Sequence, residues 1–275
     1  MTPAGPSVIS GGARRRRMKI LFLGDVVGRV GRRLVAERAA ALAADHGAEL
    51  IVANVENAAA GAGITPSTLA ALTKAGVDVA TSGNHVFAQR EAAEQMDAMP
   101  TLVRPANYPP GTPGRGYVVV TTPGGARVAV VNLAGRVFMD CLDCPFRTAD
   151  RVLEEVAGAT VVVDFHAEAT SEKEAMGHYL DGRVAAVIGT HTHVQTADER
   201  VLPGGTAYIT DVGMTGAAGG VIGTEVGPVL RRLVGKMPAR FTPAEGEGIL
   251  GAVVLDLDEV QGRARRIVRI LERRA

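Results

Sequence analysis

Five short apolar runs, each of strand length, end directly in side chains that can bind a metal ion. The run at residues 185–193 reads AAVIGTHTH, so five small apolar residues that suit a buried strand precede His191 and His193. Imidazole is a common metal ligand, and an i, i+2 spacing at a strand end can aim both rings in the same direction. The other four runs are KILFLGD, LIVANVEN, VDVATSGNH and TVVVDFH. The same arrangement therefore recurs at strands that are far apart in the sequence.

Segments with a helical pattern separate the first of these runs. We expect strands at residues 19–24, 49–55 and 77–81 and helices at residues 32–46, 65–76 and 89–99. Thr65 caps the second helix, Pro66 occupies its first position, and Gly76 ends it. The β-α alternation predicts a largely parallel sheet with helices packed on it. In open α/β sheets ligands bind outside the carboxyl ends of the strands, which is where the polar residues fall.

The second half of the chain is less regular. Residues 100–116 are rich in proline and are expected to form a loop. Ser171 and Glu174 have the spacing of a capping box. We expect a hairpin at 117–122 and 127–133, helices at 148–158, 171–180 and 226–234, strands at 160–165, 185–189 and 206–210, and a closing β pair at 249–257 and 264–271. No repeat or interdomain linker stands out, so residues 18–275 are expected to form a single domain.

The composition excludes several classes of protein. The chain has 275 residues, 47% of them hydrophobic and 21% charged, as in a soluble globular protein. No apolar run reaches the length of a membrane span, and the net charge of +1 does not predict a polyanionic partner. Cys141 and Cys144 cannot build a disulfide framework, so a cytoplasmic location is expected. We expect two free thiols in a loop; a zinc half-site or redox pair is the alternative.

The first 17 residues differ from the rest of the chain. They are rich in Pro, Gly and Ser and end in four arginines, Arg14 to Arg17. No apolar segment of signal-peptide length follows the basic run. We expect residues 1–17 to be a disordered extension, or Met18 to be the working start of translation. The alternative is an arm that binds nucleic acid, so RNA is kept as a candidate partner.

Eight polar residues lie at the expected strand ends. They are Asp25, Glu56, Asn57, Asn84, His85, His166, His191 and His193. Each has an ordinary interpretation by itself, as a helix cap, a turn residue or a buried core histidine. Together they provide carboxylates, amide oxygens and imidazoles, which suit Zn, Mn or Fe. The set is too large for one tetrahedral site and fits two metals that share a carboxylate. His46 and His178 lack this context and are left out.

The motifs at these positions resemble a known family. Gly24-Asp25, Gly83-Asn84-His85, His166 and His191-Thr192-His193, in that order, are similar to the calcineurin-like metallophosphoesterases. The segments GDVVGRVGR, NVENAA, SGNH, DFHAEATSEK and GTHTHVQTAD resemble its YmdB-like branch of 2′,3′-cyclic-nucleotide 2′-phosphodiesterases more closely. The resemblance covers about residues 18–271. It implies an α/β fold, a sandwich of two mixed β-sheets flanked by helices, and a dinuclear metal centre.

The resemblance also implies the ligand sets. One metal is held by Asp25, Glu56, Asn57 and His193, and the other by Glu56, Asn84, His166 and His191. The sequence departs from the wider family at two positions. Val27 replaces a histidine, for which Asn57 is the substitute, and Glu56 replaces a bridging aspartate. Whether Asp25 or Glu56 bridges the metals is left open.

The activity implied by the resemblance is a two-metal phosphodiesterase. A metal-bound hydroxide attacks the phosphorus of a phosphodiester, with 2′,3′-cyclic nucleotides favoured, and two Fe or Mn ions, or Zn, serve as cofactors. His85 is the candidate catalytic residue, which stabilises developing charge or protonates the leaving oxygen. A homo-oligomer is also implied. Alternatives are a mononuclear metal hydrolase and a non-catalytic regulatory or RNA-associated protein.

The residues that bind the substrate are unknown from sequence. Phe138, Phe146 and Tyr108 are expected in loops, where they could stack a base or anchor the loops themselves. Arg136 and Arg147 could contact phosphate or be solvated.

Overall fold

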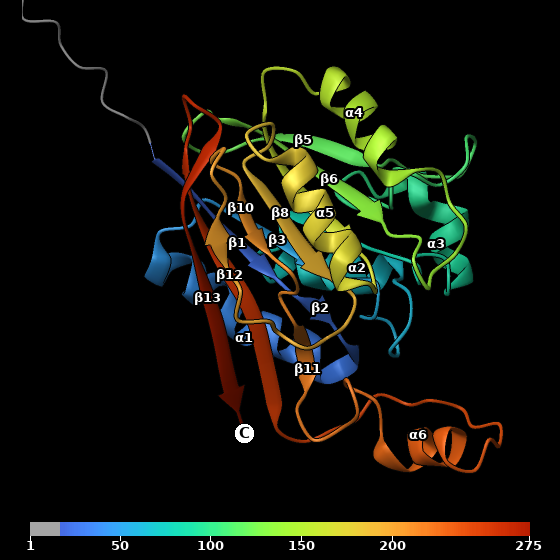
Figure 1. Cartoon of the computed structure of the whole chain (residues 1–275). Helices are drawn as coiled ribbons and strands as arrows, with labels where there is room; N and C mark the ends of the chain where they lie inside the picture. Colours follow the sequence, from blue (N-terminus) through green and yellow to red (C-terminus); the bar gives the residue numbers. More distant parts are fainter. Residues whose placement is uncertain (1–16) are drawn as a thin grey trace, which may run out of the picture.

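Two mixed β-sheets pack face to face in this computed structural model, which describes residues 17–275 (Figure 1). The first sheet has seven strands in the order β2-β11-β12-β1-β3-β4, and β13 pairs with β12. Its strands are β1 (Arg17–Leu23), β2 (Asp25–Val26), β3 (Leu50–Asn54), β4 (Val79–Thr81), β11 (Met214–Ala217), β12 (Gly248–Asp258) and β13 (Arg263–Arg274). The strands β1, β3 and β4 are parallel, whereas β12 runs antiparallel to β1.

The second sheet has six strands in the order β5-β6-β7-β8-β10-β9. They are β5 (Tyr117–Thr121), β6 (Arg127–Ala134), β7 (Thr160–His166), β8 (Ala186–Thr190), β9 (Arg200–Val201) and β10 (Ala207–Ile209). The four central strands are parallel, and the two edge strands β5 and β9 are antiparallel to their neighbours. Both faces of the parallel strands are covered, which is why they read as continuous apolar runs.

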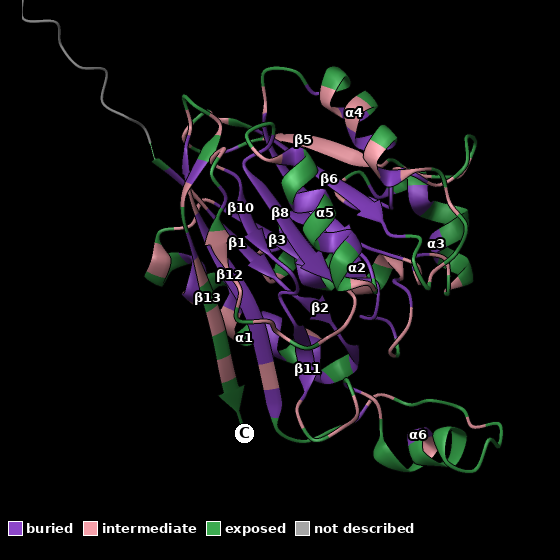
Figure 2. Ribbon diagram, viewed as in Figure 1, coloured by how far each residue is buried: buried purple, intermediate pink, exposed green. Residues whose placement is uncertain are grey.

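Strand alternation divides the core into three layers. In β1, Ile20 and Phe22 point into the cluster between the two sheets, whereas Leu21 and Leu23 point to the outer face. Helices α1 (Gly28–His46), α2 (Pro66–Lys74) and α3 (Arg90–Gln95, followed by the 3-10 turn Met96–Ala98) cover that outer face. Helices α4 (Pro145–Glu155) and α5 (Thr170–Leu180) cover the second sheet. Figure 2 shows the buried strands between these helices.

One helix does not cover either sheet. Helix α6 (Val226–Leu233) stands apart from the sandwich, and most of its surface is exposed (Figures 1 and 2). None of the helices in residues 17–275 is long and apolar enough to cross a membrane.

The sandwich of two mixed sheets confirms the expected fold class. The β-α alternation predicts a largely parallel sheet, and antiparallel strands complete the sheet that these parallel strands begin. The local pattern is right, because β1, β3 and β4 are parallel with helices between them. However, the strands of the second half form a separate sheet, and β12 and β13 return to the first one. Local periodicity does not specify which sheet a later strand joins.

Several element boundaries differ from expectation. Helix α1 begins at Gly28 instead of residue 32, because Gly31 lies directly against the backbone of Thr215 and this packing overrides the low helix propensity of glycine. Helix α4 begins at Pro145, in the favoured first position. The capping box at Ser171 is wrong, since Ala169 is the N-cap of α5 and no side chain caps the helix.

The structure also bears on the expected cap of α2 and on the expected N-terminal extension. The amide of Thr68 donates to Thr65 Oγ1 at 3.2 Å, which confirms the cap of α2. Arg17 is the first residue of β1 and pairs with Asp258, so the expected extension of residues 1–17 is one residue too long. The remainder of that prediction concerns residues 1–16, which lie outside the described residues, as do Arg14–Arg16 of the basic run.

Candidate metal centre

The strand ends of both sheets meet at one place. Asp25 opens β2, Glu56 and Asn57 follow β3, and Asn84 and His85 follow β4, all in the first sheet. In the second sheet His166 is the last residue of β7, and His191 and His193 follow β8. Distances of 3.0 to 3.9 Å link all eight of these residues into one network, in which His85 connects Asn57 to Glu56. The structure therefore brings together every site residue that the sequence predicts.

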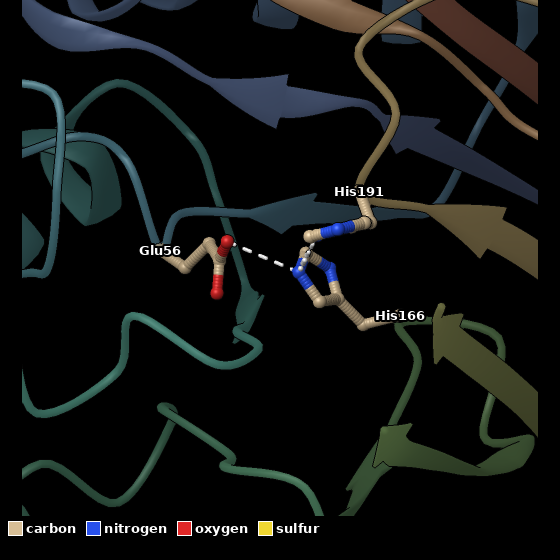
Figure 3. A group of neighbouring side chains, drawn as sticks. All are labelled: Glu56, His166 and His191. Atoms are coloured by element: carbon tan, nitrogen blue, oxygen red, sulfur yellow. Dashed lines mark hydrogen bonds and ion pairs between the residues drawn. The ribbon is translucent and has the colours of Figure 1, made fainter. Parts of the chain in front are cut away.

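His166 lies at the middle of this network (Figure 3). Its Nε2 atom is 3.0 Å from Glu56 Oε1, 3.0 Å from His191 Nδ1 and 3.1 Å from Asn84 Oδ1. One ligand atom from each of Glu56, His166 and His191 lies within 4.8 Å of the others. This cluster is compact enough for one cation to contact all three side chains.

Burial and mutual contact shift the pKa values of these groups. Burial lowers the pKa of His166, but the Glu56 carboxylate outweighs it and raises that pKa to about 9. Burial opposes ionisation of Glu56, yet His166 and His85 hold its pKa well below the usual value. Burial and the nearby His166 lower the pKa of His191 to about 3. Glu56 and His166 therefore favour each other's charged forms, and a cation bound between them would compete with a proton on His166.

Two buried oxygens beside this cluster have no hydrogen-bond partner among the described residues. They are Asp25 Oδ1 and Asn57 Oδ1. Burial raises the pKa of Asp25, although His193 and His166 act against it. An unpaired buried oxygen is costly, and the usual remedies include a bound ion. Since both atoms belong to predicted ligands, the donor set fits a cation adjacent to the first cluster.

His85 lies at the rim of the network. Its Nδ1 is 3.1 Å from Asn57 Nδ2 and 3.4 Å from Glu56 Oε1, and its backbone amide donates to Glu56 Oε2 at 2.9 Å. The hydrogen bond to Glu56 raises the pKa of His85 despite partial burial. The ring is close to half exposed, so it contacts the site on one side and solvent on the other.

A bend in the loop at residues 191–193 orients the two histidine rings, in place of the alternation of side chains along a strand. Both His191 and His193 have positive φ angles, 99° and 65°. His191 turns toward His166, whereas His193 Nε2 lies 3.9 Å from Asp25 Oδ1 and its Nδ1 lies 2.8 Å from the carbonyl of Ile222. The prediction that the i, i+2 spacing aims both rings in one direction is therefore wrong in its mechanism, because β8 ends at Thr190.

A buried ion pair between Asp211 and Lys173 holds this loop in place, because Asp211 also binds the loop backbone. Asp211 Oδ2 accepts hydrogen bonds from the Thr192 amide at 3.0 Å and from Lys173 Nζ at 2.7 Å, and its Oδ1 accepts from the Gly213 amide. The side chains of Lys173 and Asp211 are each 1% exposed. Sequence reasoning missed this pair, because Lys173 lies on α5 and only the fold brings it to Asp211.

A second set of missed residues orients His166. Thr190 Oγ1 lies 2.9 Å from His166 Nδ1 and donates to Asp164 Oδ1 at 2.7 Å, and Asn54 Nδ2 donates to Asp164 Oδ2. Burial raises the pKa of Asp164 to about 6. Groups that hold the far nitrogen of a ligating histidine fix its orientation. In the sequence, the sign of these residues is a polar side chain within or at the end of an otherwise apolar strand: Asp164 in VVVDFH and Thr190 in AVIGT. Glu168, 3.0 Å from His191 Nε2, was also missed.

Gly83 is required by close packing at the site. A Cβ atom at this position would overlap the ring of His166 and the carboxylate of Glu56. The glycine of the SGNH segment therefore allows β4 to end directly against the ligand cluster.

Comparison with known proteins places the chain in a family. The family model for YmdB-like proteins matches residues 21–270. The chain belongs to the YmdB-like family. It is 49% identical over 256 residues to the 2′,3′-cyclic-nucleotide 2′-phosphodiesterase of Bacillus subtilis (strain 168), covering 92% of this chain and 97% of that protein.

Two solved structures share the fold of this YmdB-like protein. A hypothetical protein from Thermus thermophilus superimposes with a TM-score of 0.89 at 43% identity, covering 94% of this chain and 100% of that one. A structure described as a novel phosphatase from Mycoplasma pneumoniae gives 0.90 at 32% identity, covering 94% and 95%. The resemblance stated from the motifs is thus confirmed.

Two of the aromatic residues considered for base stacking contact other aromatic rings, and Tyr108 is also close enough to Glu56 for that carboxylate to contribute, after burial, to its raised pKa. Phe146 and Tyr108 form edge-on ring contacts, with Tyr179 and Phe87 respectively, so they anchor their own segments. Phe138 is 88% exposed. Cys141 and Cys144 are free cysteines in the structure, and Cys144 is the N-cap residue of α4.

Proposed function

We propose that this YmdB-like protein is a metal-dependent phosphodiesterase that hydrolyses 2′,3′-cyclic nucleotides. The observation that carries the proposal is the pair of buried oxygens without a hydrogen-bond partner in residues 17–275, on Asp25 and Asn57, next to the cluster of Glu56, His166 and His191. Bound cations would coordinate both of these oxygens and would balance the negative charge of the Asp25 and Glu56 carboxylates. The substrate class is supported by the 49% identity to the Bacillus subtilis enzyme, which bears that activity in its name.

We assign two metal sites, with iron or manganese favoured and zinc as the alternative. The first ligand set is Asp25, Glu56, Asn57 and His193; the second is Glu56, Asn84, His166 and His191. Glu56 belongs to both sets and would contribute to holding both metals. Its Oε1 atom lies 3.0 Å from His166 Nε2, and its Oε2 accepts a hydrogen bond from the His85 amide. Carboxylate, amide and imidazole ligands together suit these metals.

The metals, when bound, lower the pKa of water and neutralise phosphate oxygens. The protein supplies the remaining functions. Asp25, Asn57 and the three histidines come from ends of strands in both sheets, so a rigid frame sets their spacing. His85 stands at the rim with one face free, and we assign it to the leaving oxygen, as hydrogen-bond donor or proton source.

The test is the metal content per chain, measured on protein purified without chelator, beside hydrolysis of bis-p-nitrophenyl phosphate and 2′,3′-cyclic AMP. We expect two metals per chain, and loss of metal and activity in His191→Ala. His85→Ala should keep both metals and lose about 10²- to 10⁴-fold in turnover, the usual contribution of a general acid.

Two results would contradict the proposal. One metal per chain, with no phosphodiester hydrolysis after manganese or iron is added back, would favour the mononuclear hydrolase or the regulatory protein. A metal-free His85→Ala protein would make His85 a ligand instead of a catalytic residue. The cytoplasmic location, the homo-oligomer, contact with RNA and a single domain for residues 18–275 stay predictions.

A further inference from the structure

A cleft opens beside the proposed metal site, and its far wall has no role in the chemistry described so far. The cleft has a volume of about 630 Å³, within the usual range of about 300–1,000 Å³ for small-molecule sites. Asn57, His85 and His193 line it on the side of the proposed metal site. Leu233 and Phe241 also line it, from a segment that contributes no proposed ligand. A ligand bound at the metals by one group would extend into this space.

The far wall belongs to a segment that leaves the sandwich. Residues 221–244 include α6, and they are closed at their base by bridges from Thr224 to Val221 and to Pro243. The carbonyl of Ile222 lies 2.8 Å from His193 Nδ1, so this base contacts a proposed metal ligand directly. In Figure 1, α6 lies away from both sheets. The segment thus adds little to the core but encloses one side of the cleft.

The side chains on this wall suit a flat aromatic ligand. Phe241 is 44% exposed and Leu233 is more exposed still. The guanidinium carbon of Arg232 lies 5.2 Å from the centre of the Phe241 ring, and this residue also lines the cleft. Aromatic rings and arginine planes are the surfaces on which nucleobases stack, largely without regard to base identity. Large apolar side chains exposed inside a cleft mark a binding surface.

We propose that this wall is the nucleobase subsite of the enzyme, with the base stacked on Phe241 and packed against Leu233. The inference rests on the proposed function, because the cyclic phosphate at the metal end fixes the position of the base. The ribose then spans the cleft between the end formed by Asn57 and His193 and the wall formed by residues 232–241.

The test compares two substrates that differ only in the base. One is 2′,3′-cyclic AMP, and the other is the methyl riboside 2′,3′-cyclic phosphate, which has the same ring phosphate and no base. In Phe241→Ala, we expect the ratio of kcat/KM for the first over the second to fall about 5- to 100-fold, as loss of one stacking contact predicts. Phe241→Trp should keep the ratio. Phe138→Ala, which removes an exposed ring outside the cleft, is the matched control.

Binding provides a readout that needs no turnover. In the His85→Ala background, where turnover is slow, calorimetry with 2′,3′-cyclic AMP should show weaker binding when Phe241→Ala is added than when Phe138→Ala is added. An unchanged ratio, or an equal fall for both substrates, would overturn the subsite. A change in sedimentation of Phe241→Ala with an unchanged ratio would overturn it in favour of an interface between two copies. If wild-type protein cleaves bis-p-nitrophenyl phosphate but neither discriminates by the base nor binds the nucleotide, the subsite fails while the phosphodiesterase stands. Nucleotide binding that depends on Phe241, with no hydrolysis of any ester, would support the subsite and refute the proposed function.

Discussion

Breaking the ion pair between Lys173 and Asp211 should cost far more stability than its single contact suggests. Both side chains are 1% exposed and their charged atoms are 2.7 Å apart. In Lys173→Met the side chain keeps similar length, but Asp211 stays buried with only the amides of Thr192 and Gly213 as donors. Removal of one partner of a buried pair costs about 3–5 kcal/mol, because the remaining charge is uncompensated. That is a large share of the roughly 5–15 kcal/mol that stabilises a typical domain.

The assay is urea unfolding with a chelator present, so that bound metal adds nothing to the measured free energy of unfolding. The matched control is Arg183→Met, which removes the pair with Asp150, whose side chains are 41% and 38% exposed. Exposed pairs contribute about 0–1 kcal/mol, so this variant should unfold near the wild-type midpoint.

A double variant separates the lost charge from the lost packing. Lys173→Met with Asp211→Asn leaves no buried charge, so its loss of stability should be smaller than the sum of the two single losses. An effect of Lys173→Met no larger than that of Arg183→Met, or full additivity of the two single losses, would refute this reasoning.

Two further predictions concern the surroundings of His166. Thr190→Val removes the hydroxyl that contacts His166 Nδ1, so we expect its metal affinity to fall about 10- to 100-fold. Thr190→Ser keeps the hydroxyl and should bind metal nearly as well as the wild type. Equal affinities of the valine and serine variants would argue against orientation of the ring by this hydroxyl. Gly83→Ala places a methyl group against His166 and Glu56, so we expect little bound metal on elemental analysis, whereas Gly219→Ala, at an exposed position with open space, should bind metal normally. Full metal content in Gly83→Ala would show that the cluster can move aside.

The candidate ligands were predictable because each directly follows a strand that periodicity identifies. A run such as TVVVDF is recognisable in the sequence, and His166 comes next in the chain. When such strands are parallel, their ends meet at one sheet edge, so sequence neighbours of strands become spatial neighbours of each other. The position of His85 at the rim follows in the same way, from the end of β4.

The residues that sequence reasoning missed depend on contacts between distant segments. Lys173 reaches Asp211 only through the packing of α5 on the second sheet, and Phe241 reaches the cleft only through the path of residues 221–244. Neither position has a local pattern that distinguishes it from a surface residue. The aromatic residues that stood out, Phe138 among them, were chosen for their place in loops, which says nothing about the direction those loops take.

The place of β1 in the first sheet has a consequence for biosynthesis. β1 is translated before both of its neighbours, β3 and β12, and it pairs along its whole length with residues 252–258 of β12. Asp25 and Glu56 lie beside strands of this first sheet, and the sheet lacks β12 until that strand has been translated. Because synthesis runs from the N-terminus, we expect the proposed metal centre to be complete, and able to bind metal, only after β12 has been translated.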